Sequence, residues 1–464
     1  MKKLRVFFSL LLIPVLIFSF SACSFRFSNL ESLIRPPKLF GNYQALQDAF
    51  EATVNQKYFL LTPETGELQS SYLTYDFDAD GSEEAVVFYA LEDSPDLAQI
   101  SYFEFNGEEW KYVSTQKGLG GTLDKVLITD LNDDGFSELL IGWPIYSSKT
   151  NKVFSEYSFV NSVFTQKSTF SYTHFEVIDV NSDGFRDILT LTVDASLPDQ
   201  RSAFARVYSF NRNSNSLTLI GETPIDGNIS SYASVSYEMV QNTNMIYIES
   251  NKGQSESITE IVYWDDETSK LISPLFDIPS QSTLITWRNI RLASYDVDGD
   301  NYLEIPTSVE MPGSVVTSTD NSNSSSTVTS DNNPITKMYF TKWVKYRNGK
   351  FVPVQYSIVN NYLGYMLNIK SSWVGKITVS GNDGQWDYYR WNSASNKIGD
   401  LLFSIYAYNN SDADSKSKYS GYEVLKTTST KTFVYQVTAD GENFGITKDW
   451  LEKNLMFTDF GGSR

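Results

Sequence analysis

Apolar and polar residues alternate over short runs through most of the chain, with turn residues between the runs. Runs such as "KVLITD" (125–130) and "ELLIG" (138–142) are rich in β-branched and aliphatic residues, which is typical of strands. Five turns follow closely on an aromatic residue, and the first of these turns, Asn106-Gly107, is a strong hairpin signal. The aromatic residues are Phe105, Phe159, Phe210, Trp264 and Tyr346. The pattern predicts an all-β protein built from repeated hairpins.

A nine-residue acidic loop occurs four times, at 76–84, 130–138, 179–187 and 296–304. Each loop reads Asp-x-Asp/Asn-x-Asp and carries a carboxylate at its ninth position. The sixth position is Gly in three loops, where a sharp turn requires a positive φ, and Asn301 in the fourth. Carboxylates about 4 Å apart repel each other by about 4 kcal/mol per pair at an effective dielectric of about 20. A bound cation would remove this repulsion.

The loops share their opening with the EF-hand calcium loop but lack its other features. An EF-hand needs a bidentate Glu at the twelfth position and a helix on each side. The twelfth residues here are Val87, Ile141, Thr190 and Thr307, and the flanking segments have the composition of strands. We therefore exclude an EF-hand.

The acidic loops and the hairpin aromatic residues recur with nearly the same spacing along the sequence. In three loops the aromatic residue follows the first Asp by 29 to 31 residues, and in the last loop by 50. The longer interval contains a Ser/Thr/Asn tract, 312–334, which we predict to be a disordered insertion. The fourth repeat, around 237–250, lacks the acidic loop. Five units of about fifty residues predict a β-propeller of four-stranded blades. Five blades can be recognised in the sequence, and the complete propeller could have six or seven. A large β-sandwich with incidental acidic turns is the alternative.

These loops and their period resemble the FG-GAP/VCBS repeats of integrin-like β-propellers, over roughly residues 70 to 355. The resemblance implies that the side chains at positions one, three, five and nine bind Ca²⁺ together with the carbonyl of position seven. Such an oxygen-only set suits a hard cation. The four sets are Asp76, Asp78, Asp80, Glu84 and the Ser82 carbonyl; Asp130, Asn132, Asp134, Glu138 and the Phe136 carbonyl; Asp179, Asn181, Asp183, Asp187 and the Phe185 carbonyl; and Asp296, Asp298, Asp300, Glu304 and the Tyr302 carbonyl.

We expect up to four structural Ca²⁺ ions. The second and third loops should bind calcium more weakly, because Asn at position three removes one charge. Solvated acidic turns without metal, and calcium that takes part in catalysis, are the alternatives.

The N-terminus predicts export. A basic head (1–5) precedes an apolar run (6–20) and small residues before Cys23. This end resembles a bacterial lipobox, which implies cleavage before Cys23, a lipid on its sulfur, and anchoring to the bacterial cell membrane outside the cytoplasm. An ordinary signal with an incidental cysteine is the alternative.

The expected divisions are a signal peptide at 1–22, a tether at 23–41, a short helix at 42–57, a propeller at 58–356, and a C-terminal α+β domain or degenerate blades at 357–464. The helix should present one apolar face to the propeller, formed by Ala45, Leu46, Ala49, Phe50 and Val54. Near the C-terminus, "QWDYYRW" (385–391) fits either an alternating buried strand or an aromatic surface for a ligand. The segment "ITKDWLEKNLMF" (446–457) predicts a final helix with Thr447 as N-cap and Ile446 stapled onto Leu451.

Charge and composition limit the function. A net charge of −19 makes nucleic acid a poor partner and divalent cations good ones. The single Cys excludes disulfides within the chain. The single His, His174, is expected to be a packed or surface residue, and a Ser-His-Asp site would have no other His to use. We therefore expect no enzyme activity, and a monomeric binding platform for a protein, peptide or glycan. A carbohydrate-active hydrolase or lyase that uses carboxylates, and a scaffold in an envelope complex, are the alternatives.

Overall fold

The computed structural model describes residues 42–457, except 146–147, 149, 161–162, 195–200, 318–326, 329–333 and 383. The described chain is predominantly β and its sheets are mainly antiparallel, as the alternating pattern predicts. The expected signal peptide, tether and lipid-bearing Cys23 lie outside the described residues. Within the described residues, none of the helices combines the length and the apolar character that crossing a membrane requires.

The chain forms two compact units. The first contains the residues up to Thr122, apart from 65–67 and 77–79, and the second contains those two short segments and the chain from Leu123 onward. β2 (Pro63–Thr65) ends at the first of these segments, where Thr65 Oγ1 donates a hydrogen bond to the Asp124 carbonyl at 3.0 Å.

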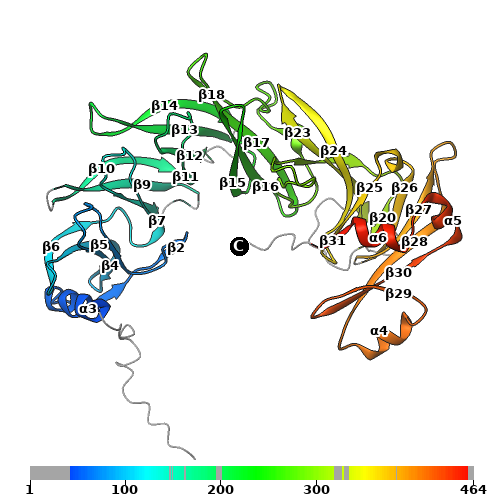
Figure 1. The fold of residues 1–464 in the computed structure, drawn as a ribbon, viewed down its shortest axis with the longest axis horizontal. Helices are drawn as coiled ribbons and strands as arrows, with labels where there is room; N and C mark the ends of the chain where they lie inside the picture. The colour runs from blue at the N-terminus through cyan, green and yellow to red at the C-terminus, as the bar shows by residue number, and fades with distance from the viewer. Residues whose placement is uncertain are drawn as a thin grey trace, which may run out of the picture. The chain divides into compact units, whose positions relative to one another are not determined.

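The first unit is one antiparallel sheet covered by a helix (Figure 1). The sheet has the order β1-β4-β5-β6, and β3 also pairs with β4. Leu46 and Phe50 of the helix are fully buried against the sheet residues Val87, Phe103 and Trp110. The elements are α3 (Asn42–Thr53), β1 (Tyr58–Leu60), β3 (Tyr72–Tyr75), β4 (Glu84–Leu91), β5 (Ser94–Phe105) and β6 (Trp110–Lys117).

Two details of the predicted helix are wrong. It ends at Thr53, four residues before the expected end, and the chain then extends toward β1. Ala45 is exposed, although Leu46 and Phe50 are buried as expected. Ala49 and Val54 of the expected apolar face are partly buried against the same cluster, so Ala45 alone of that face points away from it.

The second unit begins with three antiparallel meanders of four consecutive strands each, which is the repeat that the hairpin spacing predicts, and β2 adds a fifth strand beside β7 in the first of these sheets. Each expected aromatic residue lies at or next to the end of a strand, directly before its hairpin turn. The strands are β7 (Leu123–Thr129), β8 (Glu138–Pro144), β9 (Lys152–Val160) and β10 (Val163–Tyr172); β11 (His174–Ile178), β12 (Asp187–Asp194), β13 (Ser202–Asn211) and β14 (Ser216–Ile225); and β15 (Ser231–Val240), β16 (Thr243–Lys252), β17 (Glu256–Asp265) and β18 (Lys270–Ile272).

Consecutive sheets of this unit share apolar cores. One cluster joins Phe154 and Tyr172 to Phe175 and Ile188 of the next sheet. Further clusters join the β11–β14 sheet to the β15–β18 sheet, and the latter to the sheet that follows. The apolar residues of neighbouring repeats therefore bury each other, which explains why an isolated repeat of this size would not be stable.

The next sheet has the order β19-β23-β24-β25-β31, and the last has the order β21-β22-β20-β26-β27-β28-β30-β29. The strands are β19 (Ile305–Glu310), β20 (Val315–Thr317), β21 (Thr327–Val328), β22 (Pro334–Thr336), β23 (Tyr339–Arg347), β24 (Lys350–Asn360), β25 (Tyr365–Ile369), β26 (Ile377–Asn382), β27 (Gln385–Asn392), β28 (Lys397–Asn409), β29 (Glu423–Thr427), β30 (Lys431–Val437) and β31 (Leu455–Phe457). The short helices are η1 (Leu284–Thr286), η2 (Ser371–Trp373), α4 (Ala413–Lys418), α5 (Ala439–Phe444) and α6 (Lys448–Asn454).

Three expectations for this region differ from the structure. β24 runs through the expected boundary at residue 357, and β31 from the end of the chain pairs with β25. The described parts of the 312–334 tract include β20, which pairs in parallel with β26 and buries Val316 completely. The predicted final helix is present as α6 but ends at Asn454, and the last three residues of the expected helix, Leu455–Phe457, form β31 instead. These pairings join residues far apart in the sequence, so local composition does not predict them.

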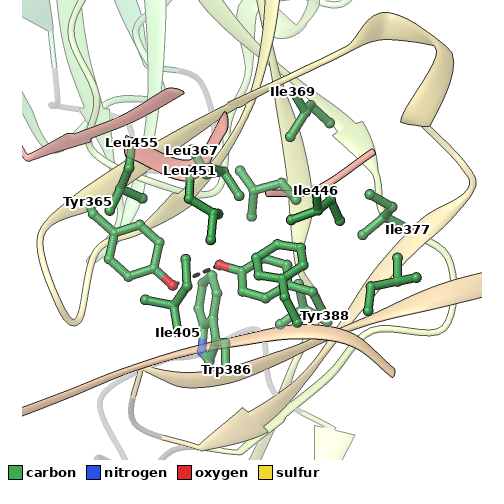
Figure 2. Close-up of a cluster of buried hydrophobic side chains, with 14 of the residues drawn as sticks. Tyr365, Leu367, Ile369, Ile377, Trp386, Tyr388, Ile405, Ile446, Leu451 and Leu455 are labelled. Atoms are coloured by element: carbon green, nitrogen blue, oxygen red, sulfur yellow. Dashed lines mark hydrogen bonds between the residues drawn. The ribbon is translucent and has the colours of Figure 1, made fainter. Parts of the chain in front are cut away.

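The C-terminal strands and helices enclose a large apolar core (Figure 2). Trp386 and Tyr388 of β27 are buried at alternate positions, which fits the buried-strand interpretation of 385–391. The hydroxyls of Tyr365 and Tyr388 lie 2.7 Å apart and share a hydrogen bond within this core. The predicted cap is confirmed: Thr447 Oγ1 accepts a hydrogen bond from Trp450 N at 3.2 Å, and the flanking Ile446 and Leu451 are buried.

Candidate metal centres

The four acidic loops occupy the same topological place. Each leads into a strand (β4, β8, β12 or β19), and the residue before its first position pairs with its ninth. These pairs are Tyr75 with Glu84, Thr129 with Glu138, Ile178 with Asp187, and Tyr295 with Glu304. The repeated motif in the sequence is therefore a repeated β-connection in the structure.

Two left-handed residues bend each loop. The sixth position has the positive φ that the sequence predicts, at Gly81 (90°), Gly135 (88°), Gly184 (90°) and Asn301 (67°). The fourth position is also left-handed, at Ala79 (55°), Asp133 (56°), Ser182 (58°) and Gly299 (79°). The sequence did not reveal the second bend, because three of these four residues are not Gly.

The first carboxylate of each loop accepts hydrogen bonds from the loop's own backbone. Asp130 accepts from Asp133 N at 2.7 Å and from Gly135 N at 2.9 Å, and Asp76, Asp179 and Asp296 repeat the pattern. These bonds fix the loop around its first side chain. Burial raises the pKa of Asp296, but the hydrogen bonds from three backbone N–H groups together outweigh it, so the pKa lies below its usual value.

The ninth carboxylate is buried in every loop, with exposed fractions of 3% for Glu84, 3% for Glu138, 1% for Asp187 and 0% for Glu304. In three loops it accepts a hydrogen bond from the backbone of the second residue, at 2.9 Å from Leu131 N, 2.9 Å from Val180 N and 2.7 Å from Val297 N. Burial, with repulsion from Glu156 on β9 and from Asp134 and Asp130 of its own loop, raises the pKa of Glu138 to about 8. Burial, with repulsion from Asp183, raises the pKa of Asp187 to about 6. A cation beside these carboxylates would oppose both shifts.

The structure brings the predicted ligands together to different degrees. In the first loop, Asp76, Asp78 and Glu84 each offer an oxygen within 4.8 Å of the others, and Asp80 lies outside this group. In the fourth loop all four acids offer an oxygen within 4.8 Å of the others: Asp296, Asp298, Asp300 and Glu304. The carboxylates of the second and third loops, which are fully described, do not form such groups.

The first loop fits a hard cation, because three carboxylates converge on one point and two of them, Asp76 and Asp78, remain partly accessible. In the third loop, part of the set is occupied with internal bonds: Asn181 Nδ2 donates to Asp183 Oδ2 at 2.9 Å, and Ser209 donates to Asp187. Whether the carbonyls of Ser82, Phe136, Phe185 and Tyr302 bind metal stays a prediction.

The fourth loop differs, because the ammonium of Lys345 lies among its acids. Nζ is 2.9 Å from Asp298 Oδ2, 2.5 Å from Asp300 Oδ2 and 3.1 Å from Glu304 Oε1. Burial by itself lowers the pKa of this lysine, but the hydrogen bonds and charges of the three acids outweigh burial and raise it above its usual range. The sequence interpretation missed Lys345 because it considered ligands within the nine positions only.

The loops also bind neighbouring strands. Leu303 N, at the eighth position of the fourth loop, donates to Glu238 Oε2 of β15 at 2.7 Å. Asn244 Nδ2 of β16 donates to the Asp179 carbonyl of the third loop at 2.6 Å. The β15–β16 turn, which lacks an acidic loop, is a tight turn with positive φ at Gln241 and Asn242. Its flanking side chains therefore connect the acidic loops on either side of it.

Outside the loops, the described residues contain no arrangement that resembles a catalytic triad. His174 Nε2 lies 2.8 Å from Glu176 Oε1, and Glu176 also pairs with Lys125 at 3.1 Å. These side chains form a partly exposed hydrogen-bonded network at the start of β11.

A buried acid on β17 gives a pH-dependent prediction. Glu260 Oε1 accepts hydrogen bonds from Asp226 N at 2.8 Å and Thr283 Oγ1 at 2.9 Å, while Oε2 has no hydrogen-bond partner. Burial and the Asp226 charge raise the pKa of Glu260 from 4.5 to about 8, against the nearby Lys252 charge and the two hydrogen bonds. The folded state therefore holds this proton after the unfolded state has lost it, and the free energy of unfolding should fall as pH rises through this window.

Glu260→Gln removes that titration and should be more stable than the wild type at about pH 8, with little difference at about pH 5. The wild-type loss should approach about 1.4 kcal/mol per pH unit inside the window. Urea unfolding followed by circular dichroism at both pH values measures this difference. Parallel pH profiles for the two proteins would contradict the prediction.

Neither a protein-family model nor a curated protein matches the chain. Among solved structures it is similar to the exotype rhamnogalacturonan lyase YesX, at 9% identity and a TM-score of 0.29, over 74% of this chain and 84% of that one. It is also similar to a mannose phosphorylase from Leishmania mexicana, at 12% identity and a TM-score of 0.23, over 48% of this chain and 74% of that one. A third similar structure is a hypothetical selenium-binding protein from Sulfolobus tokodaii, at 11% identity and a TM-score of 0.26, over 45% of this chain and 54% of that one. At these TM-scores the likeness assigns neither a family nor an activity to this chain.

Proposed function

We propose that this chain is an exported, lipid-anchored protein whose acidic loops bind calcium and whose sheets form propeller blades that present a binding surface to a protein or peptide partner outside the cytoplasm. The main support is the recurrence of one acidic loop at the same connection of four sheets. In each loop the ninth carboxylate is buried, and the first carboxylate accepts hydrogen bonds from backbone N–H groups of the loop. Such preorganised oxygens favour a hard cation.

The stacking of the sheets supports the blade interpretation. Three successive four-stranded meanders share apolar clusters with their neighbours, and each begins where the previous one ends in the sequence. Calcium in a loop would then hold the first and second strands of a blade together at one end. We infer a structural role for the ion, because the protein itself would supply most of the oxygens around it.

An exposed apolar surface on the second unit is the proposed contact site. Ile278, Leu284 and Ile285 lie in the segment between β18 and β19, with exposed fractions of 69%, 59% and 60%. Leu284 and Ile285 also line a shallow pocket of about 330 Å³, whose other walls include Tyr346 and Phe351. Clustered exposed aliphatic side chains of this kind typically mark protein contacts, whereas a glycan needs many polar partners.

The carbohydrate-active alternative requires two carboxylates that face each other across a pocket. The pocket beside Leu284 is lined by one carboxylate, Asp277. This carboxylate accepts hydrogen bonds from Ser280 Oγ at 2.5 Å and from Ser280 N at 3.0 Å. We therefore favour binding over hydrolysis.

Capture of partners from membranes tests this function. We expect the wild-type protein, immobilised in calcium, to retain a partner that the double variant Leu284→Ser/Ile285→Ser retains at least about tenfold less, since two exposed anchors of roughly 1–2 kcal/mol each are removed. The matched control is Val424→Ser, which replaces an exposed apolar residue on β29 of a different sheet. Equal capture by the wild type and the double variant would rule out this surface.

A further inference from the structure

The fourth acidic loop contains a cation supplied by the chain itself. Lys345 lies on β23, next to β19, and the pairing of Ile305 with Val344 places it directly across from Glu304. Its ammonium contacts the acids at positions three, five and nine of the loop. The lysine side chain is only 13% exposed, and Glu304 is fully buried. Nζ is therefore held inside the loop rather than resting on its surface.

Lys345 lies across from the ninth carboxylate of its loop and directly precedes the hairpin aromatic. In the other three sheets the residue at this position has an oxygen-bearing side chain. Glu104 pairs with Glu84 in the first sheet. The register of the next two sheets puts Ser158 across from Glu138 and Ser209 across from Asp187. The set is Glu104, Ser158, Ser209 and Lys345, so only the fourth of these loops has a positive charge at this place.

A lysine at this position and a calcium ion would compete for the same oxygens. The carboxylates of Asp298, Asp300 and Glu304 are three of the four side-chain ligands that the loop could offer. An ammonium can donate three hydrogen bonds and neutralises part of the clustered charge. A divalent ion entering the loop would have to displace Nζ or accept its repulsion at close range.

We propose that the ammonium of Lys345 replaces the metal ion in the fourth loop, so that calcium binds only at the first three loops, and that replacing this lysine by serine converts the fourth loop into a calcium site. This inference rests on the proposed calcium binding of the acidic loops and specifies which of them bind it. The fourth loop then keeps its shape at any calcium concentration.

Counting bound calcium by equilibrium dialysis on the full chain in detergent tests this inference. Lys345→Ser, which copies Ser158 and Ser209, should bind one more calcium ion per chain than the wild type. Adding Asp298→Asn and Asp300→Asn to Lys345→Ser should remove this extra ion. The matched control is Lys350→Ser, which removes an exposed positive charge at the start of β24 and should leave the count unchanged.

The outcomes separate this inference from the proposed calcium function. A wild-type protein that binds no calcium, with a Lys345→Ser variant that binds one ion, would refute calcium at the first three loops and support the role of Lys345. A wild-type count of four, or no gain in Lys345→Ser, would overturn the inference. If Lys345→Ser does not fold, Asp298→Asn/Asp300→Asn in the wild-type background decides: an unchanged calcium count supports the role of Lys345, and the loss of one ion overturns it.

Discussion

Removing calcium is expected to lower the melting temperature of the full chain by about 5–10 °C relative to the protein in about 10 mM calcium. The filled loops exist only in the folded state, so each bound ion stabilises that state by mass action. A site with a dissociation constant of about 10⁻⁴ M contributes about 2.7 kcal/mol at a hundredfold excess of calcium. The first loop should contribute most, because its three carboxylates already converge.

Thermal unfolding followed by circular dichroism, in calcium and in EDTA, measures this difference. Magnesium at the same concentration is the matched control, because it demands a smaller octahedral site and should restore little of the loss. The variant Asp76→Asn/Asp78→Asn should show a smaller calcium effect than the wild type. An identical melting temperature with and without chelator would refute structural calcium in this protein.

Replacing Arg288 by methionine is expected to destabilise the protein by about 3–5 kcal/mol, because it leaves a carboxylate buried without its cation. Arg288 is 1% exposed and its guanidinium pairs with Glu249, which is 3% exposed. Its Nε also donates to the Leu292 carbonyl at 2.6 Å, and its Nη1 donates to Thr259 Oγ1 at 3.0 Å. These bonds fix the irregular segment between β18 and β19, which leads into the fourth acidic loop, onto the β15–β18 sheet.

Urea unfolding gives the free energy of unfolding for this variant. The double variant Arg288→Met/Glu249→Gln should recover part of the loss, because Gln carries no charge, keeps one oxygen that can accept from Ser294 N, and has an NH2 group that can donate to Thr259 Oγ1. Arg206→Met is the matched control: its partner Glu222 is 40% exposed, so its loss should cost less than about 1 kcal/mol. If Arg288→Met cost no more than Arg206→Met, the buried pair would not have the role assigned here.

Much of the local structure could be predicted from the sequence. The hairpins lie where an aromatic residue precedes a turn, and the sixth position of each acidic loop is left-handed, at Gly135 as well as at Asn301. The cap at Thr447 also agrees with the structure. Each of these features depends on backbone torsions and hydrogen bonds within about ten residues, which neighbouring residue types determine directly.

Pairings between distant segments were not predictable in this way. β31 pairs with β25, which lies about ninety residues earlier in the sequence. β20 belongs to the tract that was expected to be disordered, yet it pairs with β26. β31 is an edge strand and β20 lies between β22 and β26, and each of these two pairings joins only three residues, too few to show an alternating pattern. They form because larger strands nearby leave backbone groups to be paired, and this depends on the assembled sheet.

The sequence by itself determined that acidic loops recur, where each lies relative to its hairpin, and which carboxylates each one offers. Only the tertiary structure decided which cation a loop meets, because the side chain across from the ninth carboxylate comes from another strand. In the fourth loop the insertion moves that strand further along the chain, yet sheet pairing still places Lys345 against Glu304. A loop's shape follows from local torsional energies, whereas its electrostatic partner follows from the register between strands.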